Sequence, residues 1–231
     1  MYSNDPEYVK KVTDNLIKVH NQDLLPVAHY KFLEKMKANG FHPKVCYDIG
    51  AAVLHWTRHA ERVWPGTKCI LFDAFAPAEM FYKYHDYTMG LLSDIDNKEI
   101  PFYQNDILFG GNSYYREVGY NNGECFPENR FITKKTRSLD SIVLEKNYPW
   151  PDLIKIDVQG AELDVLKGAT NVLSNAKVLI VELQNVEYNK GAPLYNVTKS
   201  YLESIGWTCL AMKFSDNGPD GDYCFYNTKY N

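Results

Sequence analysis

One stretch, residues 45–53, constrains the fold more than any other part of this sequence. It begins as a β-branched and aromatic run, ends in Asp48 and Gly50, and leads into apolar residues spaced three or four apart from 53 to 63. This pattern predicts a buried strand, a tight turn and an amphipathic helix, the opening unit of a nucleotide-type α/β fold. Open parallel sheets bind ligands at the carboxyl ends of their strands, so we expect a ligand beside Asp48 and Gly50.

The residues of this turn decide between two classes of cofactor. A dinucleotide fingerprint needs small residues at the positions of Gly50, Ala52 and His55, and only the first is glycine. S-adenosylmethionine has no phosphates, and a tight turn, its backbone N–H groups and an acid such as Asp48 can hold its methionine end. The next predicted strand ends in Asp73, which we expect to accept from ribose hydroxyls. The two acids together favour S-adenosylmethionine, although an aspartate after a strand is also an ordinary turn former.

Length and charge narrow the class of protein. With 231 residues, 45% of them hydrophobic, the chain can bury one substantial core, so we expect one domain, 1–231, with 1–40 as an N-terminal helical cover and 41–231 as the α/β core. A net charge of −4 without a basic run argues against a nucleic-acid partner. No apolar run approaches the ~18 residues of a membrane span, so we expect a cytoplasmic protein without a signal peptide or membrane association. The five cysteines lack CxxC spacing, which favours reduced core residues.

Periodicity predicts an alternation of helices and strands along the rest of the chain. By the same logic of strand ends, Leu92 and Ser93 are candidates to flank an adenine. The last two strands should pair as an antiparallel hairpin. We expect helices at 6–19, 27–39, 77–84, 139–143, 163–173 and 194–205. We expect strands at 87–92, 131–136, 153–157, 176–183, 207–214 and 222–227, with a further hairpin through 100–104.

The segment 110–123 is rich in glycine, asparagine and tyrosine and has no period. Long irregular connections inside a compact domain are usually functional or disordered. Tyr114, Tyr115 and Arg116 suit a polyhydroxylated acceptor, because aromatic rings cover C–H faces while a guanidinium binds hydroxyls. The alternative is a solvated surface loop with a few anchoring aromatics.

Several motifs together resemble a known family. They are Gly40-Phe41-His42-Pro43-Lys44, Tyr47-Asp48-Ile49-Gly50-Ala51, Trp56-Thr57, Phe72-Asp73, Leu92-Ser93-Asp94, the run 152–162 with Asp157-Val158-Gln159-Gly160-Ala161-Glu162, and the run 165–169. These residues resemble the FkbM family of class I S-adenosylmethionine-dependent methyltransferases over roughly 40–183. The resemblance implies a Rossmann-like α/β fold with a seven-stranded, mostly parallel sheet, an antiparallel last strand and helices on both faces. It also implies O-methylation of hydroxyls, commonly on sugars or glycosylated natural products.

The resemblance also implies which residues touch the cofactor. Carried onto this sequence, they are Asp48, Ile49, Gly50, Ala51, Ala52, Thr57, Phe72, Asp73, Ala74, Leu92, Ser93, Asp157 and Val158. The sequence departs from the family at three places, where the family usually has glycine for Leu54, glutamate for Asp73 and glutamate for Gln159. We expect Leu54 to narrow the room beside the methionine moiety and Gln159 to remove a charge near the acceptor.

Methyl transfer from a sulfonium mainly requires alignment of the acceptor oxygen, but a hydroxyl has a high pKa and usually needs a general base. Asp157, at the end of the central strand, is the first candidate, followed by Glu162 and Glu182, with Lys155 as an electrostatic partner. A divalent metal held by Asp157, Glu182 and Asn185 is an alternative that we do not favour, because no close-spaced acidic cluster supports it.

The sequence therefore predicts an S-adenosylmethionine-dependent O-methyltransferase that acts on a hydroxyl of a sugar, glycan or glycosylated small molecule. Two alternatives stay open. One is a protein that binds the cofactor without catalysis, suggested by Leu54 and Gln159. The other is an NAD-dependent oxidoreductase, against which Ala52 and His55 count. The sequence indicates neither the acceptor nor an oligomeric state.

Overall fold

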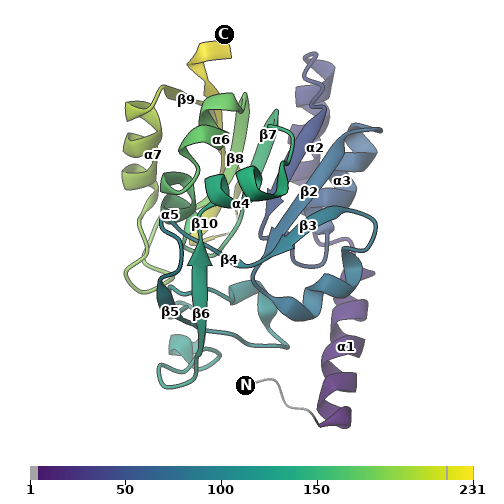
Figure 1. Cartoon of the computed structure of the whole chain (residues 1–231), viewed down its shortest axis with the longest axis vertical. Coiled ribbons are helices and arrows are strands. Elements are labelled where there is room, and N and C mark those ends of the chain that lie inside the picture. Colours follow the sequence, from purple (N-terminus) through teal and green to yellow (C-terminus); the bar gives the residue numbers. More distant parts are fainter. Residues whose placement is uncertain (1–4, 217, 231) are drawn as a thin grey trace.

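The computed structural model describes residues 5–216 and 218–230, so residues 1–4, 217 and 231 of the expected domain lie outside the described residues. Within the described residues the centre is a seven-stranded sheet, which confirms the expected fold class (Figure 1). The strand order is β3-β2-β1-β7-β8-β10-β9, and β10 runs antiparallel to both of its neighbours, as expected for the closing hairpin. The strands are β1 (Val45–Ile49), β2 (Lys68–Asp73), β3 (Asp86–Met89), β7 (Leu153–Ile156), β8 (Val178–Gln184), β9 (Trp207–Asp216) and β10 (Asp220–Asn227).

Helices cover both faces of this sheet, because its central strands are apolar on both sides. In β1, Tyr47 and Ile49 pack in the same core as α4 to α7, whereas Cys46 packs with α1 to α3 on the other face. The single helix expected over 163–173 is wrong: the chain forms α5 and α6, separated at Gly168, where an added Cβ would lie 2.2 Å from the carbonyl oxygen of Ser93. The helices are α1 (Pro6–His20), α2 (Val27–Ala38), α3 (His55–Val63), α4 (Leu139–Lys146), α5 (Glu162–Lys167), α6 (Thr170–Asn175) and α7 (Tyr195–Ser204).

A second, small sheet corrects two expectations. The single strand expected over 87–92 is β3 in the main sheet followed by β4 (Leu91–Leu92), which pairs with β6 (Ile132–Arg137). The chain turns between them at Gly90, whose N–H donates to the carbonyl of Asp73 (2.8 Å). The hairpin expected through 100–104 is also wrong, because β5 (Glu99–Phe102) pairs antiparallel with the distant β6. The local pattern of a strand does not reveal a partner some thirty positions further along the chain.

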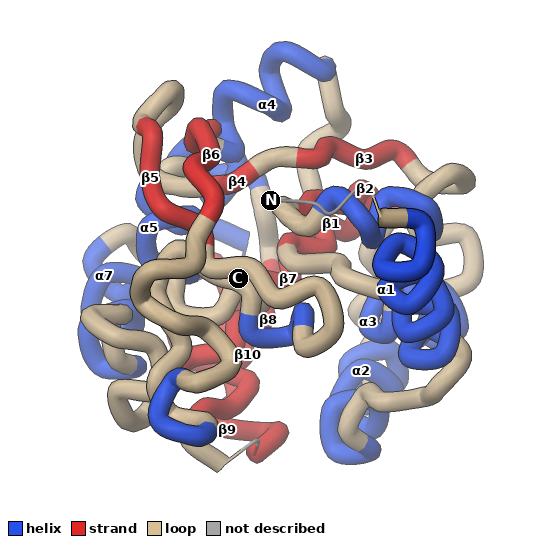
Figure 2. Tube along the Cα trace, turned by 90° about the horizontal axis from the view of Figure 1, so that it is seen from below, coloured by secondary structure: helices blue, strands red, loops and turns tan. Residues whose placement is uncertain are grey.

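The small sheet and α1 lie at the same end of the main sheet (Figure 1). Figure 2 looks onto that end and shows β5 and β6 on one side and α1 on the other. The connection between β5 and β6 reaches α1, because Tyr8 Oη donates to Asp106 (2.9 Å) and Asn15 Nδ2 donates to the carbonyl of Ile107 (3.0 Å). Short 3₁₀ helices lie at Ala76–Phe81, where a helix was expected over 77–84, and at Phe109–Gly111, Asn121–Gly123 and Thr228–Tyr230. Among the helices described, none is long and apolar enough to cross a membrane.

Candidate active site

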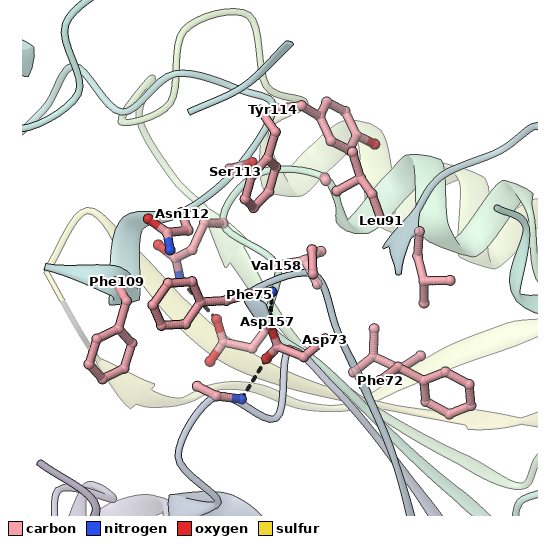
Figure 3. A pocket seen from close by; sticks show the side chains of 18 of the residues that line it. Phe72, Asp73, Phe75, Leu91, Phe109, Asn112, Ser113, Tyr114, Asp157 and Val158 are labelled. Carbon is pink, nitrogen blue, oxygen red and sulfur yellow. Dashed lines mark hydrogen bonds between the residues drawn. The ribbon is translucent and has the colours of Figure 1, made fainter. Parts of the chain in front are cut away.

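A cavity opens where β1, β2 and β7 end (Figure 3). The cavity has a volume of about 180 Å³ and is open to solvent on one side. Strand ends, the small sheet and the connection after β5 all contribute walls. The predicted site residues that line it are Ile49, Gly50, Ala52, Phe72, Asp73, Ala74, Leu92, Tyr114, Asp157 and Val158.

The turn after β1 is held in its shape by glycine. Gly50 has φ +84°, and a Cβ there would lie 1.8 Å from the carbonyl oxygen of Asp157. The N–H groups of Gly50 and Ala51 donate to the carbonyl of Phe72 (2.8 and 3.3 Å), and the N–H of Ala52 donates to Asp73 (2.6 Å). These donors were expected to hold the methionine end of the cofactor, but in this structure their hydrogen bonds end within the protein.

Asp73 lies at the end of β2 with its carboxylate at the cavity wall (Figure 3). One oxygen accepts from the N–H of Phe75 (2.7 Å), and the other accepts from the N–H of Ala52 (2.6 Å) and from Tyr82 Oη (3.3 Å). Burial raises the pKa of Asp73, while these N–H donors act in the opposite direction. A carboxylate has about four acceptor sites, so roughly one is left for a ligand hydroxyl.

Several predicted cofactor residues lie outside the cavity wall. Asp48 is buried below the turn and accepts from the hydroxyl of Thr57, and burial raises the pKa of Asp48 to about 6. Ala51 packs in the core, and Ser93 is buried and donates to Asp94 (3.1 Å). Asp48 and Thr57 therefore support the turn from beneath, and the carboxylates that reach the cavity are those of Asp73 and Asp157.

Asp157 follows β7 and is tied to two neighbouring polar side chains. Gln159 Nε2 donates to Asp157 and to Glu182, at 2.8 Å in each case, and so bridges the ends of β7 and β8. Burial alone would raise the pKa of Asp157, but Lys155 and hydrogen bonds from Glu182 and Gln159 bring that pKa below its ordinary value. Asp157 is thus a fixed carboxylate anion in the cavity wall.

Lys155 lies beneath Asp157, and its partners include residues that the sequence did not single out. Its ammonium lies 3.3 Å from Asp157 and 3.3 Å from Asp222, which follows in β10. Asp222 in turn contacts His29 Nδ1 (3.0 Å), a residue of α2. The sequence gives no local signal for this contact, because the two residues are 193 positions apart.

The connection after β5 forms the remaining wall. Of its three predicted acceptor residues, Tyr114 lines the cavity, whereas Tyr115 donates to Asp164 (2.9 Å) and Arg116 donates to the carbonyl of Phe126 (3.3 Å). Tyr115 and Arg116 thus anchor the wall. Gln159, expected near the acceptor, also lines the cavity. Lining residues that the sequence reasoning missed are Phe75, Gly90, Leu91, Phe102, Phe109, Gly110, Asn112, Ser113 and Ala161.

Asn112 is the most informative of the missed residues (Figure 3). Its Oδ1 accepts from the N–H of Asn105 (2.7 Å), which fixes the direction of the amide. Its Nδ2 is buried without a hydrogen-bond partner among the described residues. A buried donor without a partner is costly, so this one is suited to an acceptor atom of a ligand.

The described residues contain no group of three or more His, Cys, Asp or Glu side chains arranged to hold a metal ion. The three residues considered as metal ligands already have partners within the protein. Asn185 Oδ1 accepts from Tyr223 Oη (2.7 Å), and Gln159 bridges Asp157 and Glu182.

Comparison with known proteins adds to this geometry. A sequence profile described as "Methyltransferase FkbM domain" matches residues 48–208, more than half of the chain. The chain belongs to the FkbM methyltransferase family. This FkbM chain is 46% identical over 73 residues to hexuronic acid methyltransferase AglP of Haloferax volcanii, an alignment that covers 32% of the chain and 28% of that protein. It is 33% identical over 99 residues to 2-O-methyltransferase NoeI of Sinorhizobium fredii, covering 42% of the chain and 39% of that protein.

These alignments span well under half the length of either relative. Among solved structures, an O-methyltransferase from Bacillus cereus in complex with SAH is similar in fold, with a TM-score of 0.50 and 12% identity over 93% of this chain and 89% of that one. At that identity the likeness concerns the fold alone, which is that of class I methyltransferases.

Two of the residues that depart from the family pattern, Leu54 and Gln159, have a left-handed backbone conformation. Leu54, where the family usually has glycine, has φ +67°, the left-handed region that glycine adopts without strain. Its side chain is buried in the core with α1 to α3 and is not part of the cavity wall, so the expected narrowing of the cavity by Leu54 is wrong. Gln159 also lies in the left-handed region, at φ +57°. Strained residues thus occur in both turns that border the cavity, as is common at functional sites.

Glu162 anchors the turn after β7 from within the protein. It is buried, lies outside the cavity wall, and its Oε1 accepts from the N–H groups of Val158 and Gly160, both at 3.1 Å. Burial raises the pKa of Glu162 to about 7, and the two N–H groups limit the shift.

Glu162→Gln is expected to change how stability depends on pH. The pKa of Glu162 is raised in the folded state from 4.5 to about 7, so its favourable contribution is complete below pH 4.5 and is lost as pH rises to 7. Glutamine keeps the Oε1 acceptor but cannot ionise. As pH rises from 5 to 8, the wild type should lose this contribution while the variant does not. The difference in free energy of unfolding between the two proteins, measured by urea unfolding, should therefore shift in favour of the variant by up to about 3 kcal/mol. Parallel pH profiles would contradict this assignment.

Proposed function

We propose that this chain is an S-adenosylmethionine-dependent O-methyltransferase whose acceptor is a hydroxyl of a sugar, a glycan or a glycosylated small molecule. The observation that carries the proposal is the meeting of Gly50, Asp73 and Asp157, from three different strand ends, at one cavity. This is where a doubly wound sheet binds its ligand.

The residues of the cavity fit this cofactor. Asp73 keeps roughly one acceptor site for a ribose hydroxyl, and Gly50 leaves the space that a Cβ would fill. Leu91 and Leu92 offer an apolar wall for an adenine, and Asp157 offers a carboxylate to the positive end. The cofactor, when bound, supplies an electrophilic methyl group on a sulfonium.

The chain's own residues then orient the reacting groups. The lowered pKa of Asp157 makes it a weak base near neutrality, so we assign it an electrostatic role in place of the proton removal first considered. Alignment of the acceptor oxygen with the methyl carbon and the sulfur can itself lower the free-energy barrier to methyl transfer, on the order of 7 kcal/mol or more in favourable cases. Tyr114 and Phe109 present rings to the cavity, which suit the C–H faces of a sugar.

The names of the relatives support the acceptor class. One is called a hexuronic acid methyltransferase and the other a 2-O-methyltransferase. The test is incubation with isotope-labelled S-adenosylmethionine and a panel of neutral sugars, uronic acids and glycans, followed by mass spectrometry. We expect a mass gain of one methyl group on at least one hydroxyl. Tight cofactor binding without transfer to any member would favour the catalytically silent alternative, and thermal stabilisation by NAD but not by S-adenosylhomocysteine would favour an oxidoreductase.

Asp73→Ala is expected to weaken the binding of S-adenosylhomocysteine by about 100-fold, because it removes a charge-assisted contact to ribose and frees the N–H of Ala52 from its partner. Isothermal titration calorimetry measures the change. Asp96→Ala is the matched control, since Asp96 also accepts from a backbone N–H, that of Ser138 (2.6 Å), but lies outside the cavity wall. Equal affinities in the two variants would refute the ribose assignment.

A further inference from the structure

A buried polar chain leads from the cavity wall to the face of the sheet that α2 and α3 cover. It consists of Asp157, Lys155, Asp222, His29 and Trp56, which come from the turn after β7, from β7 itself, and from β10, α2 and α3. Lys155 lies 3.3 Å from each of the two carboxylates, Asp222 lies 3.0 Å from His29 Nδ1, and Trp56 Nε1 lies 3.0 Å from His29 Nε2. Four of the five residues are less than 10% exposed, and Asp157 is the one that reaches the cavity.

Trp56 fixes the protonation state of His29. An indole N–H can only donate a hydrogen bond, so His29 Nε2 must accept it with a lone pair and carries no proton. The single ring proton of His29 is therefore on Nδ1 and is donated to Asp222. Protonation of Nε2 would place its N–H opposite the indole N–H of Trp56 in the core, where two donors face each other without an acceptor. His29 is accordingly neutral in this arrangement.

With His29 neutral, the charges of the polar chain do not cancel. Two carboxylates, Asp157 and Asp222, contact one ammonium, that of Lys155. Asp48 pairs with Lys155 in the register of β1 and β7 and adds a further acid, not a cation. Glu182 hydrogen-bonds to Asp157, and burial and the charge of Asp157 raise the pKa of Glu182 well above its ordinary value, which favours its neutral form over a further negative charge.

We propose that this polar chain sets the charge of the cavity: with His29 held neutral, Asp157 keeps a surplus of negative charge that favours the sulfonium of S-adenosylmethionine over the neutral thioether of S-adenosylhomocysteine. The inference rests on the proposed function and adds to it a role for Asp222, His29 and Trp56. These three residues act through Lys155 and Asp157, so they are positioning residues. A site that discriminates in this way holds the methyl donor and releases the product.

The charge state of His29 is tested without any ligand. Long-range ¹H–¹⁵N correlation spectra of the whole protein, with the His29 signals assigned by a His29→Gln variant, are expected to show a neutral ring protonated at Nδ1 near pH 7. An imidazolium, or a ring protonated at Nε2, would overturn the inference.

The effect on the cavity is tested by the ratio of the two affinities, because the ligands differ only in the methyl group and its charge. Asp222→Asn is expected to lower the affinity for S-adenosylmethionine relative to S-adenosylhomocysteine about fivefold, and Asp157→Asn about tenfold, by calorimetry. The side chain of Asp157 is 36% exposed, so its variant provides the test even where Asp222→Asn does not fold. Asp96→Asn, a carboxylate change outside the cavity wall, should leave the ratio unchanged.

The outcomes distinguish a failure of the inference about charge from a failure of the proposed function. If the wild type binds both ligands and the ratio stays the same in Asp157→Asn, the inference about charge is overturned while the cofactor assignment stands. If the wild type binds neither ligand, the proposed function itself fails.

Discussion

Gly50→Ala is expected to abolish detectable binding of S-adenosylhomocysteine and to lower the free energy of unfolding by about 4 kcal/mol or more. Gly50 combines a φ of +84° with a position where a Cβ would lie 1.8 Å from the carbonyl oxygen and 2.8 Å from the carbonyl carbon of Asp157. Those atoms are backbone at the end of β7 and cannot rotate away as a side chain does. Relief of the clash must separate β1 from β7 at the point where Asp157 enters the cavity.

Gly40→Ala is the matched control for this prediction. Gly40 has nearly the same backbone conformation, with φ +89°, but nothing lies within 4 Å of a Cβ added there. Its substitution should cost about 1 kcal/mol, the strain of a left-handed alanine alone, and should leave binding unchanged. Urea unfolding and calorimetry on both variants separate conformational strain from the clash. Similar losses in the two variants would mean that the strand ends are not as closely packed as described.

The parts of this site that the sequence predicted are those whose signal is local. The turn at Gly50 and the carboxylate of Asp73 each follow an apolar run within a few positions, and a parallel sheet brings such strand ends to one edge whatever the details of packing. The same reasoning placed Asp157 at the cavity, and the resemblance to the family added Val158. It failed to distinguish a carboxylate at the surface of the turn from one beneath it, and so assigned Asp48 a contact that its burial and its bond to Thr57 do not offer.

The parts that the sequence did not predict depend on contacts between distant segments. The small sheet arises because β5 and β4 both pair with β6, and this divided the strand expected over 87–92. The amide of Asn112 faces the cavity only because Asn105 fixes its other end. Asp222 and His29 meet across 193 positions, and neither residue carries a motif. Periodicity reports which face of an element is buried, but it does not report which polar group on that face meets which.

Lys155→Met is expected to destabilise the protein by about 3–5 kcal/mol near pH 7, the usual cost of removing one partner from a buried ion pair. Methionine fills a similar volume but leaves the carboxylates of Asp157 and Asp222 facing each other without the ammonium that lies 3.3 Å from both. Their pKa values, which Lys155 holds below the ordinary range, should then rise through burial and mutual repulsion.

The dependence of this loss on pH distinguishes a charge effect from a packing effect. In the wild type the lowered pKa of Asp222 contributes stability that is present above its unfolded pKa of 3.8 and is lost as pH falls further. In Lys155→Met the raised pKa values allow both acids to be neutral well before that point, so the gap between the two proteins should narrow as pH falls from 7 toward about 5. Lys177→Met supplies the control, because Lys177 pairs with Asp152 at 2.7 Å but is half-exposed, and its loss should cost about 1 kcal/mol or less. A gap that stays constant with pH would show that Lys155 matters for its packing and not for its charge.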